Sequence, residues 1–395
     1  MMKRGIILLF AAIVMVMAQA QDLKMEWTQN YDESKVPAYT LPDPLLCENG
    51  HYVTTAEEWE KYCRPEVLEL LKTYMYGHAP ELKHPLEYKV DSIDTNSKDG
   101  KYTFKRVIIY LTDKKDKGPL THAEVMIPNN AKGPVPLFMI FGWGFMNRMF
   151  PSELLMDHGY GVAILNTFEA VPDSKDTFTK GLIPAYYQDK QTYRLPDEWG
   201  CLAAWAFEAS RLLDYFQNDV QVDAKRVAVL GHSRLGKAAL WAAAQDTRFA
   251  MVFPVNSGCG GGALSRRMVG ETVWAMNNSF PYWTCDNFQQ FNMREQYMPF
   301  DQHSVIALCA PRPIYLATAQ EDNWGDPLGE FLAGKAAEPV YALYHCAGIG
   351  CDSQPAVDVA MNKGYIAYHI RSGGHAILEY DWTQFIAYAD RFLKK

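Results

Sequence analysis

The pattern of apolar and polar residues changes near residue 130. Between residues 86 and 126 apolar and polar positions alternate, which predicts antiparallel strands with one face toward solvent. Beyond them lie short, wholly apolar runs separated by helical patterns such as 199–216 and 237–245; the runs are 135–141, 161–165, 227–230, 252–255, 314–317 and 365–370. Strands that are apolar on both faces and alternate with helices predict a parallel sheet covered by helices on both sides.

The segment 21–85 reads as an extension that packs on a larger domain, residues 86–395. It holds a Pro-rich coil at 41–44 and a helical pattern from about Thr55 to Tyr76, with Gly77 as its stop. A long excursion at 258–300 is rich in Gly, Trp, Asn and Phe, and we expect it to form part of a substrate cleft.

The first twenty residues have the layout of a signal peptide. Lys3 and Arg4 precede an apolar run at 6–17, and Ala18-Gln19-Ala20 follows it. This order predicts cleavage after Ala20 and a secreted or periplasmic protein. The run is too short to span a membrane comfortably.

Composition excludes some classes of partner. The chain has 395 residues, 48% of them hydrophobic and 21% charged, and a formal charge of −8, so nucleic acid is not an expected partner. The eight cysteines show no C-x-x-C spacing, and no metal or organic cofactor is implied. Export permits disulfides, for which Cys47 with Cys63 and Cys346 with Cys351 are the candidate pairs. We expect a monomer.

The stretch 226–244 carries the strongest chemical signal. An apolar run reaches Gly231, turns at Ser233 and leaves through Gly236 into a helical pattern. A Ser between glycines at a strand–turn–helix junction is typical of a nucleophile on a strained elbow. With antiparallel strands first and β/α units after them, this elbow predicts an α/β-hydrolase fold, a three-layer sandwich around a mostly parallel sheet.

A serine nucleophile needs a base and an acid, which follow it in this order in such folds. His375 is the histidine that follows the last apolar run, after the loop 371–374. The loop after 314–317 supplies carboxylates, of which Asp322 is our choice, with Glu321 and Asp326 as alternatives. Asn256 follows the neighbouring run, but an amide cannot stabilise an imidazolium by charge.

Several motifs together resemble carbohydrate esterase family 15, the glucuronoyl esterases, especially bacterial members. They lie at 63–66, 76–77, 198–206, 231–237, 246–249, 278–288 and 321–327, and so cover nearly the whole chain. The segments Ser233-Arg234-Leu235-Gly236-Lys237 and Asp322-Asn323-Trp324 are the most specific of them.

The resemblance implies roles for individual residues. Arg234 would help to hold the oxyanion, Lys237 and Glu271 would contact sugar hydroxyls, and Trp324 would form the wall of the sugar subsite. Many family members carry Glu where this chain has Asn256, and some bacterial relatives use the Asp of the Asp-x-Trp loop instead. Another departure is the segment 141–145, whose N–H groups would complete the oxyanion hole and whose Trp143 would shape the leaving-group side.

These observations predict a secreted serine esterase that hydrolyses uronic acid esters of plant cell-wall polysaccharide. The sequence leaves open glucuronate or galacturonate as the acid, and a lignin alcohol or methanol as the leaving group. An acetyl esterase acting on xylan or pectin is an alternative. A non-catalytic carbohydrate-binding relative is an alternative of another class, which Asn256 favours and Ser233 with His375 opposes.

Overall fold

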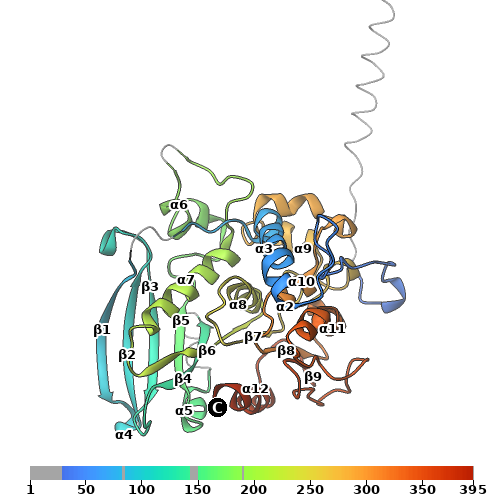
Figure 1. Cartoon of the computed structure of the whole chain (residues 1–395). Helices are drawn as coiled ribbons and strands as arrows, with labels where there is room; N and C mark the ends of the chain where they lie inside the picture. The colour runs from blue at the N-terminus through green and yellow to red at the C-terminus, as the bar shows by residue number, and fades with distance from the viewer. Residues whose placement is uncertain (1–28, 82–84, 143–149, 189–190, 395) are drawn as a thin grey trace, which may run out of the picture. The chain divides into compact units, whose positions relative to one another are not determined.

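A single mixed sheet organises this computed structural model, in which residues 29–81, 85–142, 150–188 and 191–394 are described. Its strand order is β1-β2-β3-β5-β4-β6-β7-β8-β9 (Figure 1). The strands span Glu87–Asn96 (β1), Tyr102–Tyr110 (β2), Leu120–Pro128 (β3), Val135–Gly142 (β4), Gly161–Asn166 (β5), Val222–His232 (β6), Met251–Val255 (β7), Ile314–Ala319 (β8) and Ile366–Arg371 (β9). β1, β2, β3 and β5 pair antiparallel, whereas β5, β4 and β6 to β9 run parallel. The two sequence patterns therefore form the two parts of the sheet, as predicted.

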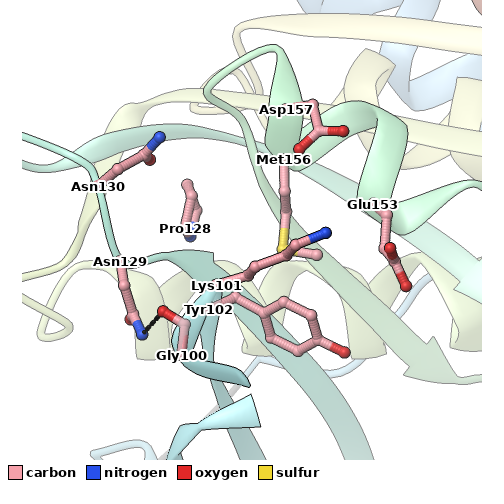
Figure 2. Close-up of a pocket in the computed structure, with 9 residues that line it drawn as sticks. All are labelled: Gly100, Lys101, Tyr102, Pro128, Asn129, Asn130, Glu153, Met156 and Asp157. Atoms are coloured by element: carbon pink, nitrogen blue, oxygen red, sulfur yellow. Dashed lines mark hydrogen bonds between the residues drawn. The ribbon is translucent and has the colours of Figure 1, made fainter. Parts of the chain in front are cut away.

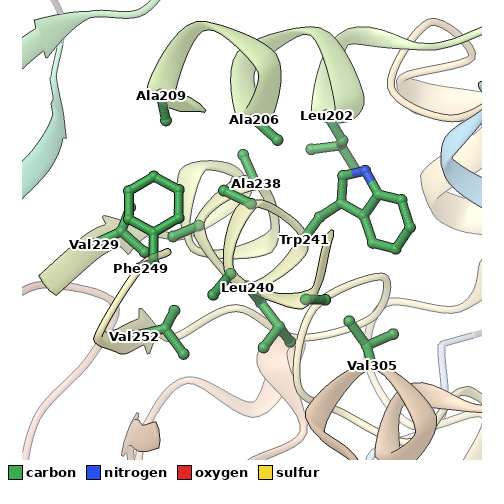
Figure 3. Close-up of a cluster of buried hydrophobic side chains, with 14 of the residues drawn as sticks. Leu202, Ala206, Ala209, Val229, Ala238, Leu240, Trp241, Phe249, Val252 and Val305 are labelled. Atoms are coloured by element: carbon green, nitrogen blue, oxygen red, sulfur yellow. The ribbon is translucent and has the colours of Figure 1, made fainter. Parts of the chain in front are cut away.

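Helices cover both faces of the sheet. They are α2 (Ala56–Glu58), α3 (Arg64–Leu71), α4 (Ser97–Gly100), α5 (Ser152–Asp157), α6 (Leu182–Ala185), α7 (Cys201–Phe216), α8 (Arg234–Gln245), α9 (Val273–Ser279), α10 (Gln302–Ala307), α11 (Pro327–Leu343) and α12 (Glu379–Leu393). In β6, Val227 and Val229 face one buried cluster together with α7, α8 and α10 (Figure 3), while Ala228 and Leu230 face another with α5 and α12. Burial on both faces explains the unbroken apolar run and confirms the three-layer α/β-hydrolase fold.

The extension before the sheet contains the predicted helix. The stretch 56–76 is helical throughout, with π-helical turns at Trp59–Cys63 and Lys72–Tyr76. Gly77 ends it with φ 84°, and a Cβ there would lie 2.4 Å from the Glu198 carbonyl oxygen. The Tyr76 ring stacks on Trp241 of α8 with 4.0 Å between centroids. Residues 31–395 form one compact unit, and the boundary at residue 85 stays a prediction.

One of the two candidate disulfides forms. Cys47 and Cys63 are bonded and tie the coil to the helix of the extension. The other pairing is wrong, because Cys346 and Cys351 are free and the Cys346 thiol donates to the Tyr344 carbonyl at 3.6 Å.

Two sequence-based predictions fall outside the described residues: the signal peptide 1–20, and the roles of Trp143 and the N–H groups beside it. Over the ranges that the structure describes, no helix has the length and apolarity needed to cross a membrane.

Candidate active site

The carboxyl ends of four neighbouring parallel strands bring the predicted residues to one edge of the sheet. Ser233 follows β6, Asn256 follows β7, Asp322 follows β8 and His375 follows β9. Ligands of open α/β sheets bind outside the carboxyl ends of strands. A cleft of about 490 Å³ lies at this edge. Its lining includes Ser233, Arg234, Lys237, Asn256, Glu271, Asp322, Trp324 and His375.

Ser233 sits on a strained turn. Its φ of 60° and ψ of −130° lie outside the regions that side-chain-bearing residues normally occupy. A Cβ on Gly231 would lie 2.0 Å from the Leu235 carbonyl oxygen, and a Cβ on Gly236 would lie 3.0 Å from the Gly231 and Val255 carbonyl oxygens. The late second glycine of the motif is therefore explained, because it lets α8 start close against β6 and β7.

His375 and Asp322 are bonded to each other. The distance from His375 Nδ1 to Asp322 Oδ2 is 2.7 Å, and the Asn256 amide donates to the same oxygen at 2.9 Å. Burial raises the pKa of a carboxyl, but the hydrogen bonds from His375 and Asn256 hold the pKa of Asp322 below its ordinary value. The His375 side chain is 42% exposed, so its far side is open to the cleft.

The alternative acids lie in other environments. Glu321 is exposed to solvent. Asp326 caps α11 through the Gly329 N–H at 2.9 Å and accepts from Arg267 Nε at 2.8 Å, so its carboxylate is committed to the scaffold. Of the three candidates, Asp322 is the one bonded to His375.

A second histidine backs His375. The rings of His232 and His375 lie 4.4 Å apart between centroids. Burial, together with the neighbouring His375, lowers the pKa of His232 to about 3. His232 is therefore uncharged near neutral pH, and its ring packs against the ring of His375.

Arg234 follows Ser233 directly, and its guanidinium packs on the stacked rings of Phe280 and Trp283. Phe280 and Trp283 stack with centroids 3.8 Å apart, and the guanidinium carbon lies 5.0 Å and 4.8 Å from the two centroids. Asp173 accepts from Arg234 Nη1 at 2.5 Å and from the Trp283 indole at 2.8 Å. The guanidinium is thus held between a carboxylate and two rings.

Lys237 and Glu271 form a buried pair under the cleft. Lys237 Nζ donates to Glu271 Oε2 at 2.6 Å and to the carbonyl oxygens of Ser257 and Cys259 at 2.8 and 2.5 Å. An ammonium group has three N–H donors, and all three are used here. The implied contact of Lys237 with a sugar hydroxyl stays a prediction, and it requires one of these bonds to be exchanged.

Sequence reasoning missed several contributors to this site. Phe280, Trp283 and Ser279 come from the excursion 258–300, which the sequence assigned to the cleft while naming Glu271 alone among its side chains. Asp173 had no local signal, because it lies 61 positions before Arg234 and meets it only through the fold.

A different pocket, of about 460 Å³, lies where the start of β2 and the end of β3 meet α5. It is lined by Gly100, Lys101, Tyr102, Pro128, Asn129, Asn130, Glu153, Met156 and Asp157 (Figure 2). Among the described residues that line it there is no Ser, Cys or His, so this pocket does not repeat the combination of Ser and His found in the cleft at Ser233. The cleft at Ser233 is therefore the candidate active site.

Comparison with known proteins identifies the family of this chain. A family model described as "Glucuronyl esterase, fungi" matches residues 111–344. The chain belongs to this family. The esterase is 40% identical to "Carbohydrate esterase MZ0003" of an unknown prokaryotic organism, with 92% of each chain covered.

Solved structures give the same result. The esterase superposes on "Glucuronoyl Esterase from Solibacter usitatus" with a TM-score of 0.86 at 38% identity, covering 91% of this chain and 99% of the other. A "promiscuous CE15 esterase from the marine bacterial metagenome" gives a TM-score of 0.84 at 38% identity, covering 92% and 100%. The resemblance to carbohydrate esterase family 15 is confirmed, and the protein is a carboxylic ester hydrolase.

Proposed function

We propose that this esterase hydrolyses esters of a uronic acid carboxylate through a Ser233–His375–Asp322 triad. The observation that carries the proposal is the 2.7 Å bond between His375 and Asp322 in the cleft that also contains the strained Ser233. Membership in the glucuronoyl esterase family supports glucuronate as the acid.

The reaction is acyl transfer in two halves. His375 Nε2 takes the proton of the Ser233 hydroxyl as the oxygen attacks the ester carbonyl, and then gives this proton to the departing alcohol. Asp322 fixes the imidazole tautomer through Nδ1–H and stabilises the imidazolium. Water, deprotonated by His375, then releases the uronate and restores Ser233.

Arg234 serves the oxyanion that forms in each half. Its backbone N–H is at the start of α8, where the first N–H groups have no partner within the helix. Its guanidinium adds a positive charge beside Ser233, and one such donor contributes about 3 kcal/mol to the transition state.

The sugar occupies the side of the cleft formed by Glu271 and Trp324. Glu271 accepts hydrogen bonds from sugar hydroxyls, Trp324 forms an apolar wall, and Lys237 holds the Glu271 carboxylate in place. The natural substrate is then plant cell-wall polysaccharide that carries esterified uronic acid, and the predicted leader exports the enzyme to it.

A panel of three ester classes tests the proposal: methyl glucuronate, methyl galacturonate and acetylated xylose. We expect the highest kcat/KM on the glucuronate ester. Activity confined to the acetyl ester would support the acetyl esterase instead. The Ser233→Ala variant should lose all measurable hydrolysis, and full activity in that variant would remove Ser233 as the nucleophile.

A further inference from the structure

The loop that carries His375 is held by hydrogen bonds from one buried side chain, that of Arg371. Arg371, the last residue of β9, is 1% exposed, and its guanidinium donates to the carbonyl oxygens of Ser372 and Gly374 at 2.8 and 3.0 Å. It also donates to the carbonyl of Ala376. One guanidinium thus binds the loop on both sides of His375, at its two sequence neighbours Gly374 and Ala376.

The guanidinium is in turn fixed by Asp381, in the first turn of α12. Arg371 Nε donates to Asp381 Oδ2 at 2.8 Å, and the Leu378 N–H donates to the same oxygen at 2.6 Å. The other oxygen accepts from His369 Nε2 at 2.9 Å, and the Tyr315 hydroxyl donates to His369 Nδ1 at 3.0 Å. Because residues two apart in a strand share a face, His369 and Arg371 meet Asp381 together.

The acid loop is bound to the same segment. Beyond the end of the sheet, the Gln320 N–H donates to the Arg371 carbonyl at 2.8 Å and the Glu321 N–H to the Gly373 carbonyl at 3.0 Å. Asp322 follows directly. The two loops that carry the acid and the base therefore continue the β8–β9 ladder, with Arg371 at the junction.

Stability alone is a weak reason for such a cluster, because the cost of burying two charges offsets most of their attraction. The position of the catalytic group is a stronger reason, because a displacement of about 1 Å of such a group lowers the rate by on the order of 100-fold.

We propose that Arg371 and Asp381 are positioning residues that set the orientation of His375 relative to Asp322 and Ser233. His369 completes the unit by holding the second oxygen of Asp381. This inference rests on the proposed triad, but it adds residues that touch neither substrate nor the reacting atoms.

The test compares Arg371→Lys and Asp381→Asn with a matched control, Arg226→Lys. Arg226 likewise holds one carboxylate, Asp223, and two backbone carbonyls, but at the opposite edge of the sheet. Each folded variant is measured for kcat and KM on the methyl glucuronate ester. The rate at which a fluorophosphonate labels Ser233 and the far-downfield proton NMR signal of His375 Nδ1–H are measured as well.

We expect both cluster variants to lose at least about tenfold in kcat and in labelling rate, with KM changed less than about twofold and the His375 signal broadened or shifted. The control should keep the wild-type values. Labelling and the NMR signal do not depend on the sugar, so they test this inference even if the uronate ester is not the substrate.

Two results would overturn the inference. One is a folded Arg371→Lys or Asp381→Asn enzyme with unchanged kcat, labelling rate and His375 signal. The other result comes from the wild-type enzyme and decides the question if neither variant folds. Rapid hydrogen exchange at the Gln320 and Glu321 amides of the folded enzyme would show that their bonds to the His375 loop do not persist. Slow exchange at these amides supports the inference.

Discussion

Asp322 is a carboxylate with two donors on one oxygen. In the Asp322→Asn variant, an amide replaces the carboxylate. Its uncharged oxygen can accept from His375 Nδ1–H, or its N–H can donate to Nδ1, which favours the wrong tautomer of His375. We expect kcat/KM to fall about 10²- to 10⁴-fold, the range for an acid–base partner. Ester hydrolysis by the purified variants measures this fall. As a control, Glu321→Gln changes the exposed neighbour of Asp322 and should leave the rate unchanged.

Asn256 supports the same carboxylate from the other side. Asn256→Ala removes one hydrogen bond to Asp322 but leaves the bond to His375, so its loss of rate should be much smaller than that of Asp322→Asn. The reverse ranking would mean that Asn256 orients His375 unaided and that the acid is not Asp322.

The positions of these residues could be predicted because each follows a wholly apolar run. Parallel strands place their carboxyl ends at one edge, so Ser233, Asp322 and His375 had to lie near one another. Nothing comparable marks Asp173 or Arg371, since their importance comes from partners that only the folded chain brings close.

At the scale of elements, the elbow between β6 and α8 depends on Gly231 and Gly236, which leave different amounts of space for a Cβ atom. In Gly231→Ala the new Cβ would meet the Leu235 carbonyl oxygen at 2.0 Å, whereas Gly236→Ala brings it to 3.0 Å from two carbonyls. We expect Gly231→Ala to lower the thermal midpoint much more than Gly236→Ala and to abolish activity. Gly133→Ala is a suitable control, because, apart from its two chain neighbours, no described residue has an atom within 4 Å of its Cβ position. Equal midpoints for the Gly231 and Gly133 variants would contradict the proposed clash.

The extension carries the disulfide Cys47–Cys63, which closes a loop with a sequence separation of 16. Loss of this cross-link in the double variant Cys47→Ser/Cys63→Ser should lower the free energy of unfolding by about 3 kcal/mol, because the unfolded chain regains the loop's freedom. Denaturant titration measures this change. The double variant Cys346→Ser/Cys351→Ser should show no such loss, because these thiols are not joined.

Element boundaries show where sequence information ends. β6 starts at Val222, five positions before the apolar run at 227. The run does not reveal this first part, because it carries Asp223, Lys225 and Arg226 and is not buried on both faces. The π-helical turns at 59–63 and 72–76 likewise left no periodic signal. Strands buried on both faces were predictable, whereas partly exposed strand ends and irregular helical turns were not.

For the whole molecule, three buried carboxyl groups couple stability to pH. Burial raises the pKa of Glu295 to about 7 and of Glu330 to about 8, and it raises the pKa of Glu208 well above its ordinary value. In the folded state these groups hold protons that the unfolded chain releases near pH 4.5. Their contribution is therefore complete below about pH 4.5 and is lost as the pH rises through 7 and 8.

Glu208 gives the cleanest test of this coupling, because neither of its oxygens has a hydrogen-bond partner among the described residues and it does not line the cleft. We expect the unfolding free energy of the wild-type enzyme to fall as pH rises from 5 to 8, and to fall less steeply in Glu208→Gln. Parallel curves for the two proteins in denaturant titrations would show that Glu208 does not keep its proton.

The contact between Asn256 and Asp322 also bears on how such a site changes over generations. A carboxylic acid at position 256 would meet the carboxylate of Asp322, and of two acids that share a site one keeps its proton. That protonated acid would donate to Asp322 as the Asn256 amide does now, so we expect an Asn256→Glu enzyme, with acids at both positions, to remain active. In such an enzyme the loss of one acid would leave the other, so the catalytic acid would be able to move from the end of one strand to the next through active forms.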